Sequence, residues 1–374
     1  MDKTPGTRLL EIMAEKQRTQ EYLAEIMWKS RTKITEIVNG KEKINTERAI
    51  LLEEATWEKA SEWLALQQII DLEETQEKQK SKIDEVKWRL KLYENFPVHE
   101  LVRRWILTPT RDVNVLISQT KQLFGITNLE ADLFPQATNY RKNDFPGVNK
   151  KNLDVWLKLS EIASVRINNK FSVPAYNELG LTELLKKLSG MSTQEEIGVS
   201  LVFEELKKVW VIVVVLKHFE KTKIDGACYW NKMIDKPVIV LSLRYHRLDN
   251  FWFTLSHEIG HIIKHQDFLK TNENSFIEFG NIDSLGDIQK LQEQEANKFA
   301  QDVLIDETVW RGLITNPFLT PRAISFFSAQ GNVHPAILVG RLKFEKILPY
   351  GVMSRITNKR VDEWIPKEHT FWTM

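Results

Sequence analysis

Apolar residues recur every three or four positions through the first part of the chain. This spacing predicts a compact bundle of amphipathic helices over residues 5–70. Asn39 and Gly40 favour the end of one helix, and Asn45 is a capping residue that favours the start of the next. The apolar positions that carry the pattern are Leu9, Leu10, Met13, Leu23, Ile26, Met27, Ile34, Ile37, Val38, Ala49 and Leu52.

The segment 71–95 has a different pattern, in which charges of both signs alternate around a sparse apolar stripe. Such a pattern is typical of a solvent-exposed helix, here a connector that ends at Pro97. Helical spacing dominates again from about 98 to 195, with breaks at segments that contain proline. We therefore expect a helical middle region over 71–195.

Residues 196–245 change character, because short β-branched and aromatic runs alternate with turn residues. The runs VWVIVVVL, GACYW and KPVIVLSLR predict the strands of a small sheet. Helical patterns return at 249–265 and 288–304. The expected fold class is therefore α+β and mostly helical. The expected domains are 1–70, 71–195 and 196–374.

A predicted helix carries the pattern H-E-x-x-H at His257, Glu258 and His261. Residues four apart share one face of a helix, so the two imidazoles can point at one metal ion. Zn²⁺ accepts neutral imidazole nitrogens and leaves a position open for water, from which Glu258 can take a proton. The alternative is a core helix with incidental histidines. Asp249 is the expected N-cap, and we expect His265 at the surface or behind the ligands.

Zinc hydrolases of this kind need a third ligand, and the next helix offers Glu293 and Glu295. Glu293 lies within about 40° of the centre of the expected buried face, whereas Glu295 lies about 120° away. We therefore assign Glu293 as the third ligand. Asn297 follows four residues later and is placed to hydrogen-bond a ligating histidine. The buried face is defined by Ala296, Ala300 and Val303.

The sequence FWFTLSHEIGH, followed by EQEANKFAQDVLI, resembles the ImmA/IrrE family of zinc metallopeptidase-like domains. The resemblance extends over about 196–345 and includes KPVIVLSLR and VHPAILVGRL. It implies a reduced gluzincin-like domain, in which a small sheet packs on the metal-binding helix, with Zn²⁺ as the cofactor. Asp306 stands where the family often has proline, a departure that affects the end of a helix rather than the metal.

His334 is a second candidate for catalysis, because a peptidase site uses a donor to stabilise the oxyanion of its tetrahedral intermediate. It also precedes Pro335, and proline is favoured at the first position of a helix. The sequence slightly favours the second role, in which His334 starts a helix.

Within the N-terminal bundle, Thr19 and Ser30 are spaced to cap two consecutive helices that a short turn separates. This order predicts a helix-turn-helix whose second helix presents Arg, Lys and Thr to base edges. The basicity is local, since residues 28–48 hold six basic and three acidic side chains. The candidate base-contacting residues are Gln20, Arg31, Thr32, Lys33 and Thr35, and the candidate phosphate-contacting residues are Lys41 and Lys43.

Residues 4–70 resemble the Cro/C1-type DNA-binding domain of HigA-like antitoxins, on the motifs TPG, ITEIVNGKEKI and WLALQ. The resemblance implies binding to an operator as a homodimer, with a cognate toxin as a candidate partner. Trp28 departs from the family, since many members have glycine in this turn and a positive φ strains tryptophan. We therefore expect the turn to be rearranged. The alternative is a helical bundle that binds only protein.

Composition sets limits on this interpretation. The single cysteine, Cys228, excludes an internal disulfide and fits a reducing compartment. The N-terminus lacks the apolar run of a signal peptide, and the most apolar stretch is too short to span a bilayer. We therefore expect a cytoplasmic protein that does not bind membranes. The net charge of +1 indicates no class of partner.

The sequence as a whole predicts a DNA-binding transcriptional regulator of antitoxin type that carries a zinc metallopeptidase-like domain. As a peptidase it would cleave a protein partner by zinc-activated water attack. The alternative is a non-catalytic repressor whose zinc domain is structural, sensing or partner-binding. An intact Glu258 favours chemistry, because a metal can be held without it.

Overall fold

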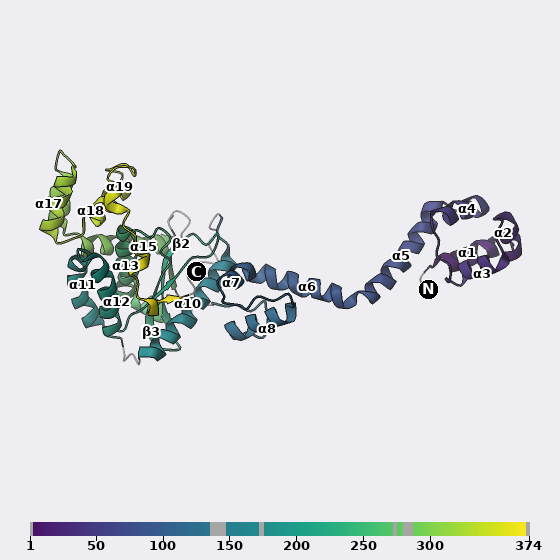
Figure 1. The fold of residues 1–374 in the computed structure, drawn as a ribbon, viewed down its shortest axis with the longest axis horizontal. Coiled ribbons are helices and arrows are strands. Elements are labelled where there is room, and N and C mark those ends of the chain that lie inside the picture. Colours follow the sequence, from purple (N-terminus) through teal and green to yellow (C-terminus); the bar gives the residue numbers. More distant parts are fainter. Residues whose placement is uncertain (1–2, 135–146, 172–175, 272–274, 280–286, 372–374) are drawn as a thin grey trace. The chain divides into compact units, whose positions relative to one another are not determined.

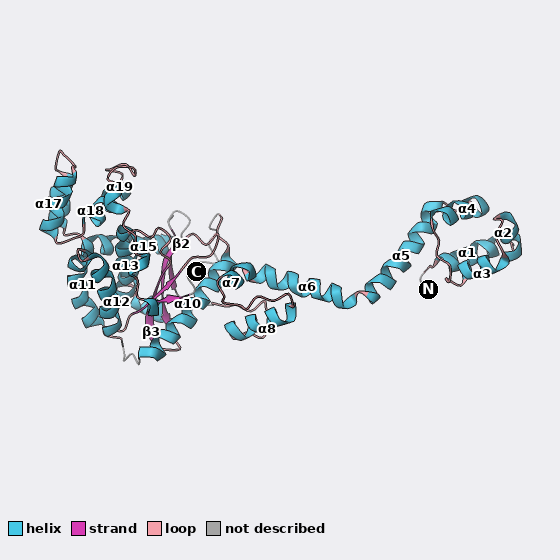
Figure 2. Cartoon of the chain, in the orientation of Figure 1, coloured by secondary structure: helices cyan, strands magenta, loops and turns pink. Residues whose placement is uncertain are grey.

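The computed structural model describes residues 3–134, 147–171, 176–271, 275–279 and 287–371. Its contacts group into two compact units, Met1–Leu90 and Lys91–Met374. Figure 1 shows the order of the helices and strands in each unit, and Figure 2 shows their secondary structure. In the part of the chain that the structure describes, no helix is both long and apolar enough to cross a membrane.

The N-terminal unit is built from helices whose starts are encoded locally. Three of the predicted caps are confirmed, because the side chains of Thr19, Ser30 and Asn45 each accept a hydrogen bond from a backbone N–H three residues later. Thr4 caps the first helix in the same way. Its helices are α1 (Pro5–Glu15), α2 (Gln20–Ile26), α3 (Arg31–Val38), α4 (Thr46–Thr56) and α5 (Ala60–Lys78). Helix α6 (Lys80–Asn95) begins in this unit and ends beyond Leu90.

One small apolar cluster holds this unit together, and α1 and α3 approach each other at backbone distance. A Cβ atom on Gly6 would lie 2.1 Å from the carbonyl oxygen of Val38, so only glycine fits there. In the turn before α3, Trp28 has φ 52° and an exposed fraction of 93%. The expectation that this turn is rearranged to avoid a positive φ is wrong, since Trp28 adopts the left-handed conformation itself. The core residues include Leu9, Ile12, Leu23, Ile34, Ile37, Ala49, Leu52 and Trp63.

The C-terminal unit contains a five-stranded mixed sheet in the order β4-β2-β3-β1-β5. Strand β1 is parallel to β3 and β5, and β2 is antiparallel to β3 and β4. The first three strands agree with the predicted runs, whereas β4 and β5 were not predicted. The strands are β1 (Ile212–Leu216), β2 (Ile224–Asn231), β3 (Lys236–Leu241), β4 (Ser275–Phe279) and β5 (Thr370–Phe371).

Helices cover both faces of this sheet, as Figure 1 shows. Alternate residues of β1 enter different cores, Ile212 and Val214 on one face and Val213 and Val215 on the other. The first core includes residues of α7 (Val98–Arg103), α8 (Val113–Phe124) and α10 (Lys150–Phe171). Residues within the expected middle region 71–195 therefore supply one layer of the sheet's own packing.

The second core is closed by the remaining helices and contains the H-E-x-x-H helix, α13. These helices are α11 (Glu178–Ser192), α12 (Glu195–Lys208), α13 (Leu248–Lys264), α14 (Gln266–Lys270), α15 (Asp287–Leu304), α16 (Glu307–Ile314), α17 (Pro321–Gly331), α18 (Pro335–Phe344) and α19 (Ser354–Thr357). Helix α13 is buried along most of its length, so the histidines it carries lie in the interior.

Candidate metal centre

Helix α13 begins one residue before the predicted start. Its N-cap is Arg247, and the prediction that Asp249 caps the helix is wrong. Asp249 lies within the first turn, where its carboxylate accepts hydrogen bonds from the Arg247 guanidinium at 3.0 and 2.9 Å. A Cβ atom on Gly340 of α18 would lie 2.6 Å from this carboxylate, so α18 packs directly on the start of α13. The negative charge of Asp249 still stabilises the first turn of α13 through the helix dipole.

The structure brings His257, His261 and Glu293 together. The two Nε2 atoms are 3.0 Å apart, and the Glu293 carboxylate lies 3.1 Å from Nε2 of His257 and 3.5 Å from Nε2 of His261. One donor atom from each of the three residues lies within 4.8 Å of the others, and all three side chains are buried. These residues form a single cluster that can hold a metal ion.

Close approach of α13 and α15 produces this cluster. A Cβ atom on Gly260 would lie 2.9 Å from the ring of Phe299 and 3.4 Å from Cα of Ala296, so the two helices meet where α13 has no side chain. Glu293 lies one turn before Ala296 and therefore faces the histidines. The predicted helical phase of Glu293 agrees with its burial, and the Glu295 side chain is 63% exposed.

The protonation states in the cluster suit a divalent cation. Burial lowers the pKa of His261 to about 4, so its imidazole is neutral at physiological pH. Burial alone would raise the pKa of Glu293, but the facing imidazoles of His261 and His257 outweigh it and hold this pKa below its usual range. Neutral imidazoles and a carboxylate are the donor set that zinc hydrolases use. These residues therefore fit Zn²⁺.

Each histidine is oriented by a hydrogen bond from its other ring nitrogen. Nδ1 of His257 lies 3.0 Å from Oδ1 of Asn297, and because this oxygen only accepts, Nδ1 carries the proton. In the neutral tautomer that Asn297 favours, Nε2 of His257 offers its lone pair to a metal ion, on the side where Glu293 lies 3.1 Å away. The hydrogen bond that the sequence assigned to Asn297 is present in the structure.

A second chain of hydrogen bonds supports His261 and places His265 behind the ligands, which is one of the two positions expected for it. Its Nδ1 lies 3.3 Å from Nδ1 of His265, whose Nε2 donates to Glu295 at 2.8 Å. With the Nε2 proton directed at Glu295, Nδ1 of His265 accepts from His261, and Nε2 of His261 keeps its lone pair. The signal in the sequence was the four-residue step from His261 to His265. The ring of Phe276 on β4 stacks on His261 at 3.9 Å between centroids.

Glu258 follows His257 in the chain, but its carboxylate packs on strand β2. A Cβ atom on Gly226 would lie 2.6 Å from Oε1 of Glu258, so glycine is needed at this point of the strand. Burial and the neighbouring Glu258 carboxylate hold the pKa of the Cys228 thiol well above its usual range. Glu258 itself is fully buried. It is thus adjacent in sequence to a metal-ligand candidate and stays outside the cluster of donors.

His334 caps α18, which is the role the sequence slightly favoured. Its Nδ1 accepts a hydrogen bond from the backbone N–H of Ala336 at 3.0 Å, and its Nε2 lies 3.4 Å from Glu195. Its backbone N–H donates to Ser192. Burial lowers the pKa of His334. None of these three contacts belongs to the metal cluster.

The candidate DNA-contacting residues lie on and after α3, and several are engaged within the unit. Thr35 donates to Oε1 of Gln20 at 2.8 Å, which links two of the candidates to each other. The cationic candidates have acidic neighbours: Arg31 pairs with Glu21, Lys33 with Glu36 and Glu42, and Lys43 with Asp71 and Glu74. Thr32 and Lys41 are exposed, as are the side chains of Arg31, Lys33 and Lys43.

A comparison with protein families places the metal cluster in a known context. Residues 208–316 match the model of the Peptidase_M78 family, the IrrE N-terminal-like domain. No curated protein matches the chain. The matched segment runs from the start of β1 beyond the end of α16 and contains His257, His261 and Glu293. The part of the chain that holds the candidate metal centre is therefore an IrrE-like, metallopeptidase-like domain.

Proposed function

We propose that the chain is a DNA-binding regulator whose C-terminal unit hydrolyses a peptide bond in a protein partner. The observation that carries the peptidase part is the buried cluster of two imidazoles and a carboxylate, with Glu258 beside it. The family match over 208–316 supports the same class of chemistry.

In this proposal His257, His261 and Glu293 hold Zn²⁺, and each remaining residue has a defined task. The bound ion would act as a Lewis acid toward the substrate carbonyl and the attacking water. Glu258 takes the proton of that water and delivers it to the leaving amine nitrogen. Gly226 leaves room for the Glu258 carboxylate, and Asn297 and His265 keep the imidazoles in the tautomers that ligation requires.

The regulatory part of the proposal rests on the N-terminal unit. The capped helix α3 exposes Arg31, Thr32 and Lys33, and Lys41 and Lys43 follow within a few residues. Cations arranged in this way can contact base edges and neutralise phosphates. We infer an antitoxin-type repressor that binds its operator as a homodimer, with a cognate toxin or another protein as the substrate of the zinc domain.

One observation favours the alternative of a non-catalytic repressor. The exposed fractions of His257, His261 and Glu293 are 1%, 0% and 4%, and Glu258 has no exposed surface. Structural zinc sites are closed, whereas catalytic sites keep a position open for water and substrate. A closed cluster is thus compatible with a zinc ion that only stabilises or senses.

Replacement of Glu258 by glutamine separates the two functions. Glu258→Gln keeps the size of the side chain, so zinc content should stay at wild-type level while cleavage falls at least about 10²-fold. The readout is an immunoblot, in cells, of the neighbouring gene's product and of the protein's own N-terminal unit. Glu307→Gln on α16, which removes an exposed carboxylate of the same unit, is the matched control. Equal processing by wild type and Glu258→Gln would favour the non-catalytic alternative.

A further inference from the structure

The helical segment after the N-terminal bundle has no packing partner within its unit. Trp63 and Gln67 of α5 are buried, but no residue from Gln68 to Leu90 is. The two helices are joined at Gln79, whose N–H donates to Thr75 and whose carbonyl accepts from Ile83, both at 2.9 Å. The helical hydrogen-bond pattern therefore continues from α5 into α6. Most of the stability of a helix in a protein comes from packing of its apolar face, and the apolar face of this segment is exposed.

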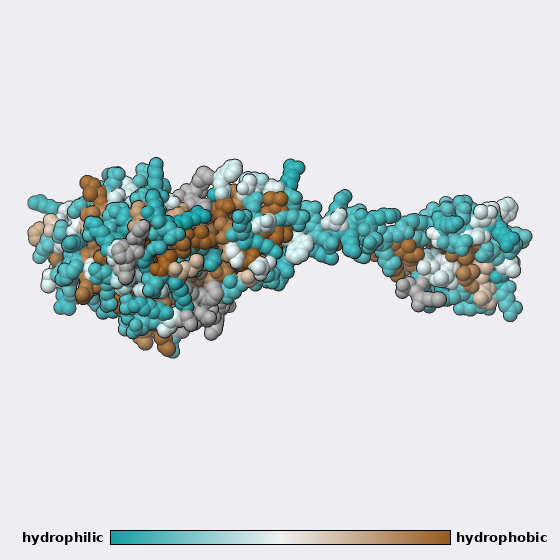
Figure 3. Space-filling view, turned by 90° about the horizontal axis from the view of Figure 1, so that it is seen from below, coloured by the Kyte–Doolittle hydropathy of each residue, from teal (hydrophilic) through white to brown (hydrophobic). Residues whose placement is uncertain are grey.

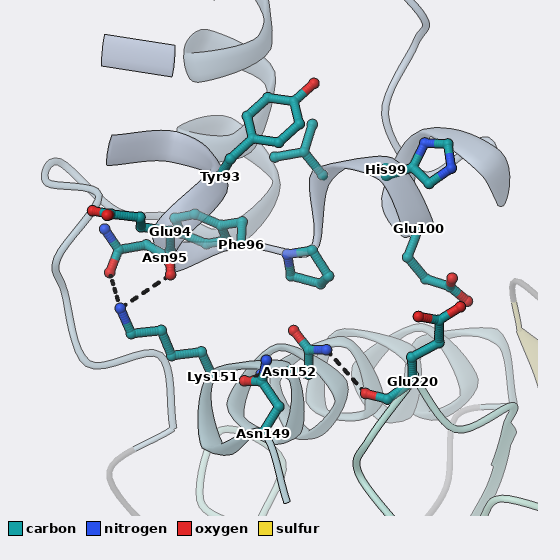
Figure 4. Close-up of a pocket in the computed structure, with 12 residues that line it drawn as sticks. Tyr93, Glu94, Asn95, Phe96, His99, Glu100, Asn149, Lys151, Asn152 and Glu220 are labelled. Carbon is teal, nitrogen blue, oxygen red and sulfur yellow. Dashed lines mark hydrogen bonds between the residues drawn. The ribbon is translucent and has the colours of Figure 1, made fainter. Parts of the chain in front are cut away.

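The apolar residues of this segment are exposed and follow a seven-residue repeat. Ile69, Leu72, Val86 and Leu90 are 51%, 53%, 66% and 58% exposed. Together with Ile83 they fall on two positions of every seven, with steps of three and four residues. The first position of the repeat holds Ile69, Gln76, Ile83 and Leu90, and the fourth holds Leu72, Gln79 and Val86. The segment is mostly hydrophilic in Figure 3, as expected when apolar residues occupy so narrow a line.

We propose that residues 69–90 form a parallel two-stranded coiled coil with a second copy of this chain. In a parallel pair each residue of the stripe faces the same residue of the second chain, and the two form one layer. The aliphatic residues therefore pack on aliphatic residues. Gln76 and Gln79 then face identical glutamines, and their amides can hydrogen-bond across the pair. Ile69 and Ile83 at the first position and Leu72 at the fourth are the choices that favour two parallel strands, whereas Leu90 and Val86 are not.

The reverse orientation fits this sequence less well. An antiparallel pair can keep the stripe aligned in two registers. One pairs Gln76 with Gln79 but sets Leu90 against Ala65, so it aligns one aliphatic layer fewer than the parallel pair. The other sets Gln79 against Ile83 and Gln76 against Val86. Each amide would then be buried without a partner, which costs free energy. The parallel pair has a cost of its own, since Lys82 and Lys87 of the two copies lie on flanking positions that face each other. Asp84, which lies 3.7 Å from Lys87, reduces this repulsion.

A coiled coil here would also give the N-terminal units a two-fold arrangement. Dimeric repressors read two half-sites with two symmetry-related helices, and each copy contributes one α3. This consequence rests on the proposed function, but the coiled coil itself does not. Its tests need neither DNA nor a substrate.

Sedimentation velocity of the full chain tests the proposal directly. The wild type should be a dimer at micromolar concentration, and the double variant Val86→Glu with Leu90→Glu should be a monomer, with the dissociation constant raised at least about 100-fold. Both side chains are exposed, so zinc content should stay unchanged, and circular dichroism should lose at most the helicity of residues 69–90. Trp88→Glu is the matched control, because Trp88 is an exposed apolar residue of α6 outside the stripe. A monomeric wild type, or a dimer that survives the double variant, would overturn the proposal and leave the metal chemistry untouched.

A disulfide cross-link tests the orientation. Val86→Cys should join two copies under mild oxidation, because the same layer meets itself only in a parallel pair. Glu85→Cys, one residue away on the outer face, should remain monomeric on a non-reducing gel. The native Cys228 is fully buried and does not compete. A dimer that the double variant breaks, but that Val86→Cys does not cross-link, would overturn the parallel arrangement.

Discussion

The two units of this protein place their candidate functional residues in opposite environments. In the N-terminal unit most of the candidates are exposed, and the cations Arg31, Lys33 and Lys43 are engaged by neighbouring carboxylates. In the C-terminal unit the metal-ligand candidates are buried and come from two helices that meet at Gly260. The first kind of surface needs only a correctly capped helix. The second needs a complete sheet and two cores, so it depends on the fold of the whole unit.

Loss of a metal ligand should produce the largest effect, a fall in zinc affinity that is confined to the C-terminal unit. His261→Ala removes one of three donors, so zinc affinity should fall by more than about 100-fold. This is a larger fall than the one expected when a residue that only orients a ligand is replaced. Elemental analysis after dialysis against a chelator measures how much zinc each variant retains. Binding to promoter DNA should stay at wild-type level. A variant with full zinc content would show that the ion is held elsewhere.

A smaller loss of zinc affinity is expected when Asn297, which orients His257, is replaced. Asn297→Ala removes the acceptor for Nδ1 of His257, so zinc affinity should fall about 10–100-fold. Competition with a chromogenic chelator gives the value. Lys298→Ala, the next residue on α15, bears an exposed side chain and should leave the affinity unchanged. Equal affinities for the two variants would contradict the role of Asn297.

In the N-terminal unit, Arg31→Ala should weaken specific DNA binding by about 1–3 kcal/mol if Arg31 contacts a guanine. Lys41→Ala should weaken binding to all sequences alike and lower the log–log salt dependence by about 0.9. Titrations at several salt concentrations separate the two effects, and zinc content should not change in either variant. If wild type and both variants bind DNA with the same affinity at every salt concentration, this surface is excluded as the DNA-contacting surface.

Acid should destabilise the units at different pH values, because all eight histidines lie in the C-terminal unit. Burial lowers the pKa of His218, His334 and His369 from 6.5. Such groups bind fewer protons folded than unfolded, so their contribution to stability is present above pH 6.5 and is lost as the pH falls through the lowered values.

The N-terminal unit has only carboxylates and basic groups, so it should keep its stability until the pH falls below about 4.5. Scanning calorimetry of the full chain between about pH 7.5 and pH 5 should therefore show one transition that moves to lower temperature and one that does not. Two transitions that shift together would contradict this difference between the units.

The smallest effect is expected at the strained turn. Trp28→Gly should stabilise the N-terminal unit by at most about 1 kcal/mol, because relief of the positive φ exceeds the entropy that glycine adds to the unfolded state. Little packing is lost, since Trp28 is 93% exposed. Trp88→Gly, within α6, should instead destabilise by about 1 kcal/mol. Chemical denaturation followed by circular dichroism compares them, and a destabilised Trp28→Gly would show that the turn is not strained.

The sequence predicted those features that depend on neighbours in the chain. Thr19, Ser30 and Asn45 cap their helices as expected, since the hydrogen bond spans three residues. The phase of Glu293 was predictable because one helix fixes it, and the structure buries this residue as predicted. The pairing of Asn297 with His257 followed from the same phase.

Features that depend on distant segments were missed. Strand β4 and strand β5 are short, and what makes them strands is pairing with β2 and β1. The start of α13 was placed at Asp249, whereas contacts from Arg247 and from Gly340 on another helix decide where that side chain lies. The contact of Glu258 with β2 depends on Gly226, and no local pattern joins these two positions.

The pairing of β1 with β5 has a consequence for synthesis of the protein. Val215 is paired with Thr370, and Nδ1 of His369 lies 2.7 Å from the carbonyl oxygen of Val213, so the sheet that supports α13 is completed by a segment that is translated long after β1. The N-terminal unit uses no residue beyond Leu90. At translation rates of about 5–20 residues per second, roughly 15–55 s separate the two events. A growing chain can therefore form its candidate DNA-binding helices well before it can finish the sheet behind its metal centre.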